Sequence, residues 1–156
     1  MASRWSSRLA VWLLPILGAA AVPRLAAQRV RELGVQAVFT AADEATFVAG
    51  PLIAIRPSPR ARLSLGTGVG ISEETLAWRA ELLGHFLLNP ARRRGFGLYG
   101  AAGVAASAGP FERGYIVLAL GMESRPGTRS GWTVEAGVGG GVRFAAGYRW
   151  RRSVPP

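Results

Sequence analysis

His85 is the only histidine in the sequence, and histidine is the side chain most often used to move protons in catalytic sites. A hydrolase or transferase acting on lipid acyl chains would place it beside a serine nucleophile and a carboxylate. No serine and acid in the sequence are matched to His85, which we place facing inward on a strand, close to Arg62. We interpret it as a structural residue and expect no enzyme activity; a lipid-modifying enzyme is kept as a third hypothesis.

Residues that could bind a phosphate, a metal or a cofactor lack the partners they would need. The run Gly66-Thr-Gly-Val-Gly70 resembles a phosphate-binding loop only in its glycines, because no helical pattern follows and no Lys-Ser or Lys-Thr pair is present. The sequence has no cysteine, which excludes disulfides and thiolate metal sites, and it contains no cluster of metal-ligand residues. We expect neither a metal nor a cofactor.

Charged residues inside strand-like segments indicate a structural role, an ion-pair network in the protein interior. We centre the last hairpin on Gly140, which places Gly137 opposite Arg143 and puts Glu135 on the diagonal. Cross-strand neighbours on one face touch, so Arg143 would meet a strand with no side chain in its way. Charges buried in this way must pair. The predicted interior network comprises Arg79, Glu81, Glu135 and Arg143.

An earlier hairpin repeats this relationship between glycine and charge. A two-residue turn at Glu73-Glu74 places Gly68 opposite Arg79. The same register places Gly66 opposite Glu81. The spacing therefore predicts room for both long side chains on the inner face of this hairpin.

These charged residues belong to segments that alternate between apolar and small or polar side chains, which is the period of a β-strand. An apolar outer face and a polar inner face are typical of a membrane-spanning barrel. We predict an all-β fold, an eight-stranded antiparallel up-and-down membrane β-barrel closed by its last strand. A bulge or kink is expected at Pro51. The expected strands cover about residues 33–40, 46–56, 62–72, 76–88, 96–107, 114–123, 132–138 and 141–150.

Charges in the connections sort by end of the predicted barrel. The odd-numbered turns hold Asp43, Glu44, Glu73, Glu74 and Glu112, with Arg113 as the one cation. The even-numbered turns and the chain ends hold Arg29, Arg31, Arg60, Arg92, Arg93, Arg94, Arg125, Arg129, Arg151 and Arg152. This sorting predicts an even number of strands, with both termini on the basic side, and by analogy with known barrels that side faces the periplasm. The alternative interpretation is ordinary solvation of turn charges.

Aromatic residues gather near the ends of the predicted strands, as in the interfacial girdles of membrane barrels. The alternative is a water-soluble, lipocalin-like, ligand-binding barrel in the periplasm, with its apolar face turned inward. Its surface strands would then carry many glycines, which suit strands poorly. The predicted interfacial aromatics are Trp78, Phe86, Trp132, Tyr148 and Trp150, together with Phe39, Phe47 and Phe96.

The N-terminal stretch, residues 1–27, has the pattern of a signal peptide. Arg4 and Arg8 precede a short apolar run, and Arg24-Leu-Ala-Ala27 offers a small-residue cleavage site. An uncleaved anchor helix is the alternative, although the apolar run is short for a membrane span. Residues 28–156 would then form the single barrel domain. The basic composition, 19 arginines against 9 acids, follows no helix face, so we expect no nucleic acid partner.

The chain resembles the small eight-stranded outer-membrane barrels of the OmpA/OmpX type. The resemblance covers about residues 29–152 and rests on architecture and on strands such as Phe96-Gly-Leu-Tyr-Gly-Ala-Ala-Gly. The terminal strand, ending at Tyr148-Arg-Trp150, approximates that family's insertion signal. It departs at Ala145, where the family has glycine, and by continuing past Trp150.

The resemblance implies a bacterial outer-membrane protein that is non-enzymatic and has a structural or envelope-maintenance role. Eight strands leave no wide pore. The implied partners are outer-membrane lipids, and the barrel-assembly machinery and periplasmic chaperones during export. We expect a monomer. The second hypothesis remains the periplasmic ligand-binding barrel described above.

Overall fold

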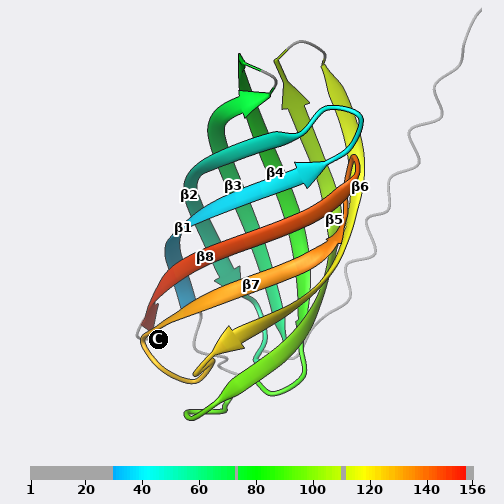
Figure 1. Ribbon diagram of the computed structural model, residues 1–156. Helices are drawn as coiled ribbons and strands as arrows, with labels where there is room; N and C mark the ends of the chain where they lie inside the picture. Colours follow the sequence, from blue (N-terminus) through cyan, green and yellow to red (C-terminus); the bar gives the residue numbers. More distant parts are fainter. Residues whose placement is uncertain (1–29, 73, 110–111, 154–156) are drawn as a thin grey trace, which may run out of the picture.

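The computed structural model is a closed barrel in which each of eight strands pairs antiparallel with its sequence neighbours (Figure 1). It describes residues 30–72, 74–109 and 112–153, so the predicted signal peptide and the predicted domain boundary at residue 28 lie outside the described residues. No helix in this part of the chain is long and apolar enough to cross a membrane. The predicted all-β, up-and-down topology is confirmed. The strands are β1 (Val30–Ala41), β2 (Thr46–Arg56), β3 (Ala61–Ser72), β4 (Thr75–Leu87), β5 (Phe96–Ala108), β6 (Arg113–Ser124), β7 (Ser130–Val138) and β8 (Val142–Ser153).

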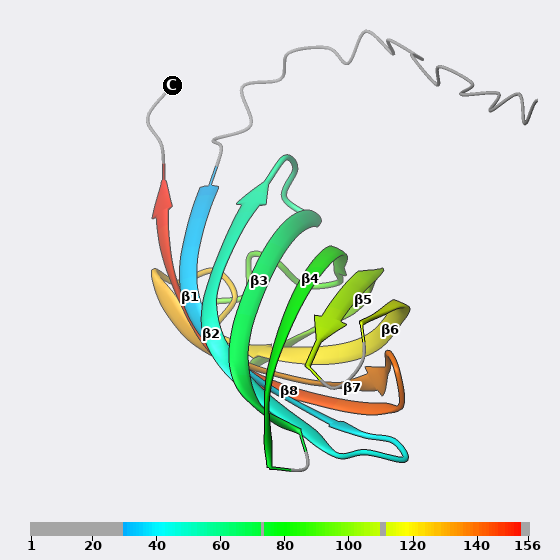
Figure 2. The same cartoon turned by 90° about the horizontal axis from the view of Figure 1, so that it is seen from above.

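Strand β8 closes the barrel by pairing with β1, as the sequence predicts (Figure 2). The pairing runs from Val30 opposite Ser153 to Ala41 opposite Val142, so both ends of the described chain lie at one end of the barrel. The expected end of this strand at Trp150 is wrong, because the ladder continues to Ser153. The residues past Trp150 are therefore partly strand.

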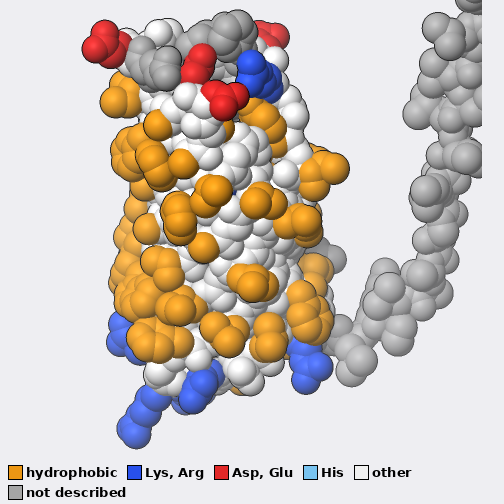
Figure 3. All heavy atoms as spheres, turned by 45° about the vertical axis from the view of Figure 1, so that its right-hand side comes forward, with side chains coloured by type: hydrophobic (Ala, Val, Ile, Leu, Met, Phe, Trp, Pro, Cys, Tyr) orange, Lys and Arg blue, Asp and Glu red, His pale blue; other side chains and the backbone are white. Residues whose placement is uncertain are grey.

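Side chains alternate between an apolar outside and an inside that holds the buried charged residues, together with apolar ones such as Leu83 and Val117. Leu76 and Leu120 are each 76% exposed, whereas Arg143 is 0% and Glu32 is 1% exposed. A water-soluble barrel would reverse this arrangement, because burying apolar surface is what stabilises a protein in water. The outward apolar band is the surface expected of a barrel in lipid, and Figure 3 shows it between the two ends of the molecule.

Pro51 lies within β2 without inserting an extra residue. Ala49 pairs with Val69 before it, and Leu52 pairs with Gly66 after it, in one continuous register. The expected bulge is therefore wrong. Instead, residues 50 and 51 are skipped in the ladder to β3, which fits a residue that has no N–H to donate.

The two ends of the barrel carry opposite charge, as Figure 3 shows. At the acidic end, the described surface residues are Asp43, Glu44, Glu74 and Glu112, with Arg113. At the basic end they are Arg31, Arg60, Arg92, Arg93, Arg94, Arg125, Arg129 and Arg152.

The turn between β7 and β8 uses glycine for positive φ, with Gly140 at 81° and Gly141 at 145°.

Candidate functional site

The inside of the barrel is filled by charged side chains. Among the residues that the structure describes, six arginines and four glutamates are each at most 9% exposed. Because an eight-stranded barrel is only wide enough for side chains to fill, these residues occupy the lumen. They are Glu32, Arg56, Arg62, Arg79, Glu81, Glu123, Glu135, Arg143, Arg149 and Arg151.

Toward the acidic end, Arg143 is the centre of a first cluster. Its Nε and Nη2 donate to the two carboxylate oxygens of Glu81, at 3.0 and 2.6 Å, and its Nη1 donates to Glu135 at 2.8 Å. Arg79 Nε donates to Glu81 at 2.8 Å and its Nη2 donates to the carbonyl of Gly139 at 2.9 Å. The structure thus brings together the four residues that the sequence analysis grouped.

The register that makes room for this cluster is the one expected from the sequence. Gly66 lies opposite Glu81 and Gly68 lies opposite Arg79 in the β3–β4 pair. Gly137 lies opposite Arg143 in the β7–β8 pair. At each of these positions, the residue opposite the long charged side chain is a glycine, which has no side chain of its own.

A second cluster, toward the basic end, was not anticipated. Arg56 Nε donates to Glu32 at 2.5 Å and Arg62 forms an ion pair with Glu123. Arg151 forms ion pairs with both Glu32 and Glu123. The sequence predicts Arg151 among the surface charges at the chain end, which is wrong: Arg151 is 9% exposed and points inward as the next residue in the alternation after Arg149.

Arg149 joins the two clusters into one column of charge. Its Nη1 lies 3.7 Å from a Glu32 oxygen and its Nη2 lies 3.8 Å from a Glu135 oxygen. Tyr99, which is 2% exposed, donates its hydroxyl to Glu135 at 2.8 Å, and the Arg62 guanidinium lies 5.5 Å from its ring centre. The charged network therefore runs most of the length of the lumen.

His85 has a serine neighbour that the sequence analysis missed. Ser64 Oγ and His85 Nε2 are 2.8 Å apart and share a hydrogen bond. A hydrolytic triad would also need a carboxylate on Nδ1, but that atom has no hydrogen-bond partner. Ser64 and His85 are 2% and 4% exposed, so the pair is enclosed by the network rather than open to substrate.

A metal site is not formed by the described residues, in which no group of three or more potential ligands comes together. The four interior glutamates are instead surrounded by arginines. A guanidinium beside each carboxylate supplies the positive charge that a bound cation would otherwise provide.

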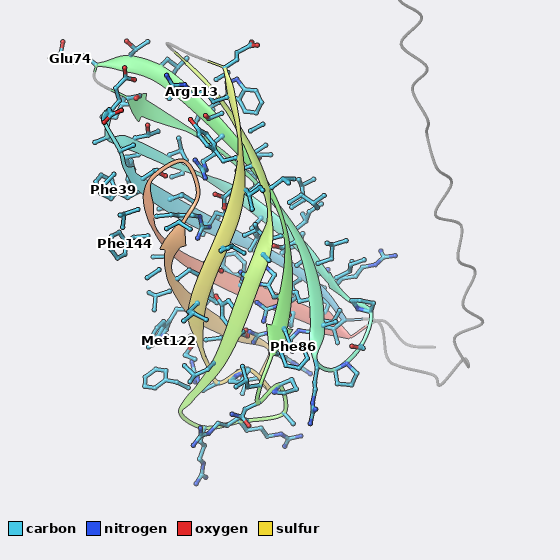
Figure 4. All side chains as sticks on the ribbon, turned by 90° about the vertical axis from the view of Figure 1, so that its right-hand side faces the viewer. Phe39, Glu74, Phe86, Arg113, Met122 and Phe144 are labelled. Carbon is cyan, nitrogen blue, oxygen red and sulfur yellow. The ribbon has the colours of Figure 1, made fainter. Side chains whose placement is uncertain are left out.

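The predicted interfacial aromatics all lie on the outer face. Trp78 is near the acidic end of β4, and the other four are near the basic end of their strands. Rings contact each other there at a steep angle: Tyr148 and Trp150 pack edge to face with centres 5.1 Å apart, and the ring centres of Trp132 and Phe96 are 5.2 Å apart. A second group sits higher on the barrel, where Phe39 is directly opposite Phe144 (Figure 4).

Comparison with known proteins shows that this chain is similar in fold to solved β-barrel structures. No protein-family description and no curated protein matches the sequence. The crystal structure of the N-terminal β-barrel domain of Pseudomonas aeruginosa OprF is similar with a TM-score of 0.63 at 12% identity, covering 78% of this chain and 97% of that one. The solution NMR structure of the de novo designed protein TMB2.3 is similar with a TM-score of 0.53 at 16% identity, covering 85% and 99%. The chain therefore has the fold of the small eight-stranded, membrane-type β-barrels, as its resemblance to the OmpA/OmpX type implies.

Proposed function

We propose that this chain is a small, non-enzymatic, integral outer-membrane β-barrel protein with a structural or envelope-maintenance role. One observation carries the proposal: the lumen is filled by a continuous network of paired arginines and glutamates. A barrel filled in this way contributes a stable, lipid-embedded wall rather than a route through the membrane.

A wide pore is disfavoured by the pairs that cross the lumen. Arg143 on β8 and Glu81 on β4 belong to strands that are not neighbours in the sheet, yet they are bound by two hydrogen bonds. Opening a channel here would separate buried charges, and removing one partner of a buried pair typically costs about 3–5 kcal/mol. The network supports a closed barrel.

The surface supports a location in a bilayer. An apolar band surrounds the barrel, aromatics flank it, and the two ends carry opposite charge. We infer that the bacterial outer membrane is the site of residence, that its lipids are the main partners, and that the barrel is a monomer. The barrel-assembly machinery and periplasmic chaperones would act on it during export. No role with nucleic acid is proposed.

Membrane fractionation and gel migration test the proposal. The protein is expected in the outer-membrane fraction, and its folded form in detergent should migrate faster than the boiled form. In planar bilayers the purified barrel should give no large, stable conductance. Recovery from the periplasm without detergent would contradict the proposal and support the ligand-binding alternative.

A deletion strain tests the envelope role. We expect greater sensitivity to detergents and large antibiotics, restored by the wild-type chain. An unchanged permeability barrier would leave the location intact and contradict envelope maintenance.

A further inference from the structure

A shallow groove of about 1200 Å³ lies on the outer surface, across β3 to β7. It is almost entirely apolar, and its outward-facing lining includes Leu63, Gly84, Phe86, Gly100, Ala102 and Leu120. It interrupts the apolar band at a depth where lipid chains would contact the protein.

The groove arises from small residues between large ones. Gly84 lies between Leu63 and Ala102 on the neighbouring strands, and Gly100 lies between Phe86 and Leu120. Each glycine omits an outward side chain, so its two larger neighbours stand above an open strip of backbone. The hollow is therefore built by two adjacent cross-strand rows.

Folding does not require glycine at these two positions. A Cβ built on Gly100 would meet nothing within 4 Å, and one on Gly84 would meet only the Ala102 carbonyl at 3.7 Å. Gly103 on the inner face is different, because a Cβ there would collide with the backbone of Leu82 and Leu83. The outer glycines leave room for something outside the barrel.

Arginines border the groove where it reaches the basic end of the barrel. Pro57, Ala61 and Leu88 line that end. They adjoin the β2–β3 turn, which carries Arg60, and the β4–β5 connection, which carries Arg92, Arg93 and Arg94. These side chains are exposed, and every described acidic residue lies either in the lumen or at the opposite end of the barrel.

We propose that the groove binds a phospholipid with an anionic headgroup. Its phosphate accepts hydrogen bonds from Arg60 and Arg92–Arg94, and one acyl chain lies along Gly84 and Gly100. Arginine suits phosphate because its planar guanidinium donates two parallel hydrogen bonds, and a cation near a membrane surface attracts anionic lipid by about 1 kcal/mol. The proposal rests on the membrane location inferred above.

Charge also argues for lipid over a second copy of the chain. A symmetric dimer through this face would bring the same patch of both copies together. The two sets of arginines would then lie at one level of the membrane and repel each other. An anionic headgroup neutralises them instead.

Native mass spectrometry of the full-length, detergent-extracted barrel tests the site. The probes are phosphatidylglycerol and phosphatidylcholine with identical acyl chains. The wild-type protein should retain one phosphatidylglycerol, with phosphatidylcholine retained about tenfold more weakly. The triple variant Arg60→Gln, Arg93→Gln, Arg94→Gln should lose this preference. It keeps Arg92, whose Nη1 donates to the Phe96 carbonyl at 3.1 Å within the connection.

Matched variants control for charge and for bulk. Arg31→Gln, Arg129→Gln, Arg152→Gln removes three exposed charges from the same end outside the groove lining, and it should retain the preference. Gly100→Leu fills the groove and should abolish retention, whereas Ala49→Leu places a leucine at an outward-facing position of β2, outside the groove, and should not. Heat-modifiable migration establishes whether each variant is folded. If Gly100→Leu does not fold, Gly84→Leu takes its place as the variant that fills the groove.

Three results would overturn the lipid site. They are equal retention of the two lipids, undiminished retention by Gly100→Leu, and an equal loss in the charge control. A dimer that disappears in Gly100→Leu would assign the groove to a second copy instead. Any of these leaves the proposed location untouched, whereas absence from the outer-membrane fraction would remove its basis.

Discussion

Arg143 holds Glu81 through two parallel hydrogen bonds, at 3.0 and 2.6 Å, across the lumen from β8 to β4. The same guanidinium binds Glu135 at 2.8 Å. One cation on β8 thus serves two buried carboxylates, one from β4 and one from β7, so the cluster joins three strands. Arg143 is 0% exposed, so both of these ion pairs are shielded from bulk water.

Arg143→Leu should destabilise the folded barrel by about 3–5 kcal/mol, because Glu81 loses its bidentate partner and Glu135 loses its shortest ion pair. Denaturant unfolding in detergent micelles, followed by tryptophan fluorescence, measures the change. Arg79→Leu should also destabilise the barrel while leaving membrane targeting unchanged. Wild-type stability in both variants would contradict a structural role for the network.

Arg151→Ala should lower the free energy of unfolding by roughly 1.5–3 kcal/mol, since Glu32 and Glu123 each lose one charged donor but keep others. Arg152 is its matched control, because it follows directly in the chain but is exposed. Arg152→Ala should change stability by less than about 0.5 kcal/mol. Equal effects of the two substitutions would show that Arg151 does not act through the lumen.

Gly121→Ala should cost about 1–3 kcal/mol, because a Cβ there would overlap the buried ring of Tyr99 and displace its hydroxyl from Glu135. Gly100→Ala, on the outer face of β5, should be neutral to within about 0.5 kcal/mol, since its Cβ would meet open space. The comparison uses one chemical change at two positions. Similar midpoints for the two variants in chemical denaturation would argue against close packing around Tyr99.

His85→Ala and Ser64→Ala should leave the lipid composition of producing cells unchanged and reduce barrel stability modestly. The reason is that the pair shares one enclosed hydrogen bond at 2.8 Å and lacks a carboxylate on Nδ1. Mass spectrometry of extracted lipids, with the empty strain and wild type as references, provides the measurement. A lipid modification that both substitutions abolish would establish an enzyme.

The members of the first cluster could be identified from the sequence because two hairpin registers place a glycine opposite Arg79, Glu81 and Arg143, although the pairing of Arg143 with Glu81 across the lumen could not. The strict alternation of β3 and β4 identifies their inner faces, and a two-residue turn fixes the register that sets Gly68 opposite Arg79. Pairing within a hairpin depends only on turn length. Fold and hairpin register could thus be read from the residues themselves.

The second cluster could not be assembled in the same way. Glu123 and Arg149 fall on the inner face by alternation, but partners across a lumen come from strands far apart in sequence, and alternation specifies only a face. Two strand ends were also set too short, which left Glu32 outside β1 and Arg151 outside β8. Extending the alternation of inward and outward residues past Trp150 would have placed Arg151 on the inner face. The Ser64–His85 contact is different, because the two residues are diagonal neighbours in the β3–β4 hairpin, where Arg62 lies opposite His85 and Ser64 lies opposite Leu83. The predicted register was therefore the available signal for this contact.

Three of the six luminal arginines, Arg143, Arg149 and Arg151, are supplied by β8 alone. A partly assembled sheet of the first seven strands would carry three arginines against four glutamates, an excess of negative charge facing a low-dielectric interior. Of the eight strands, the one synthesised after the other seven is thus the one that neutralises their luminal charge. A chain truncated before β8 could therefore neither pair the open edges of β1 and β7 nor balance the charge of its lumen.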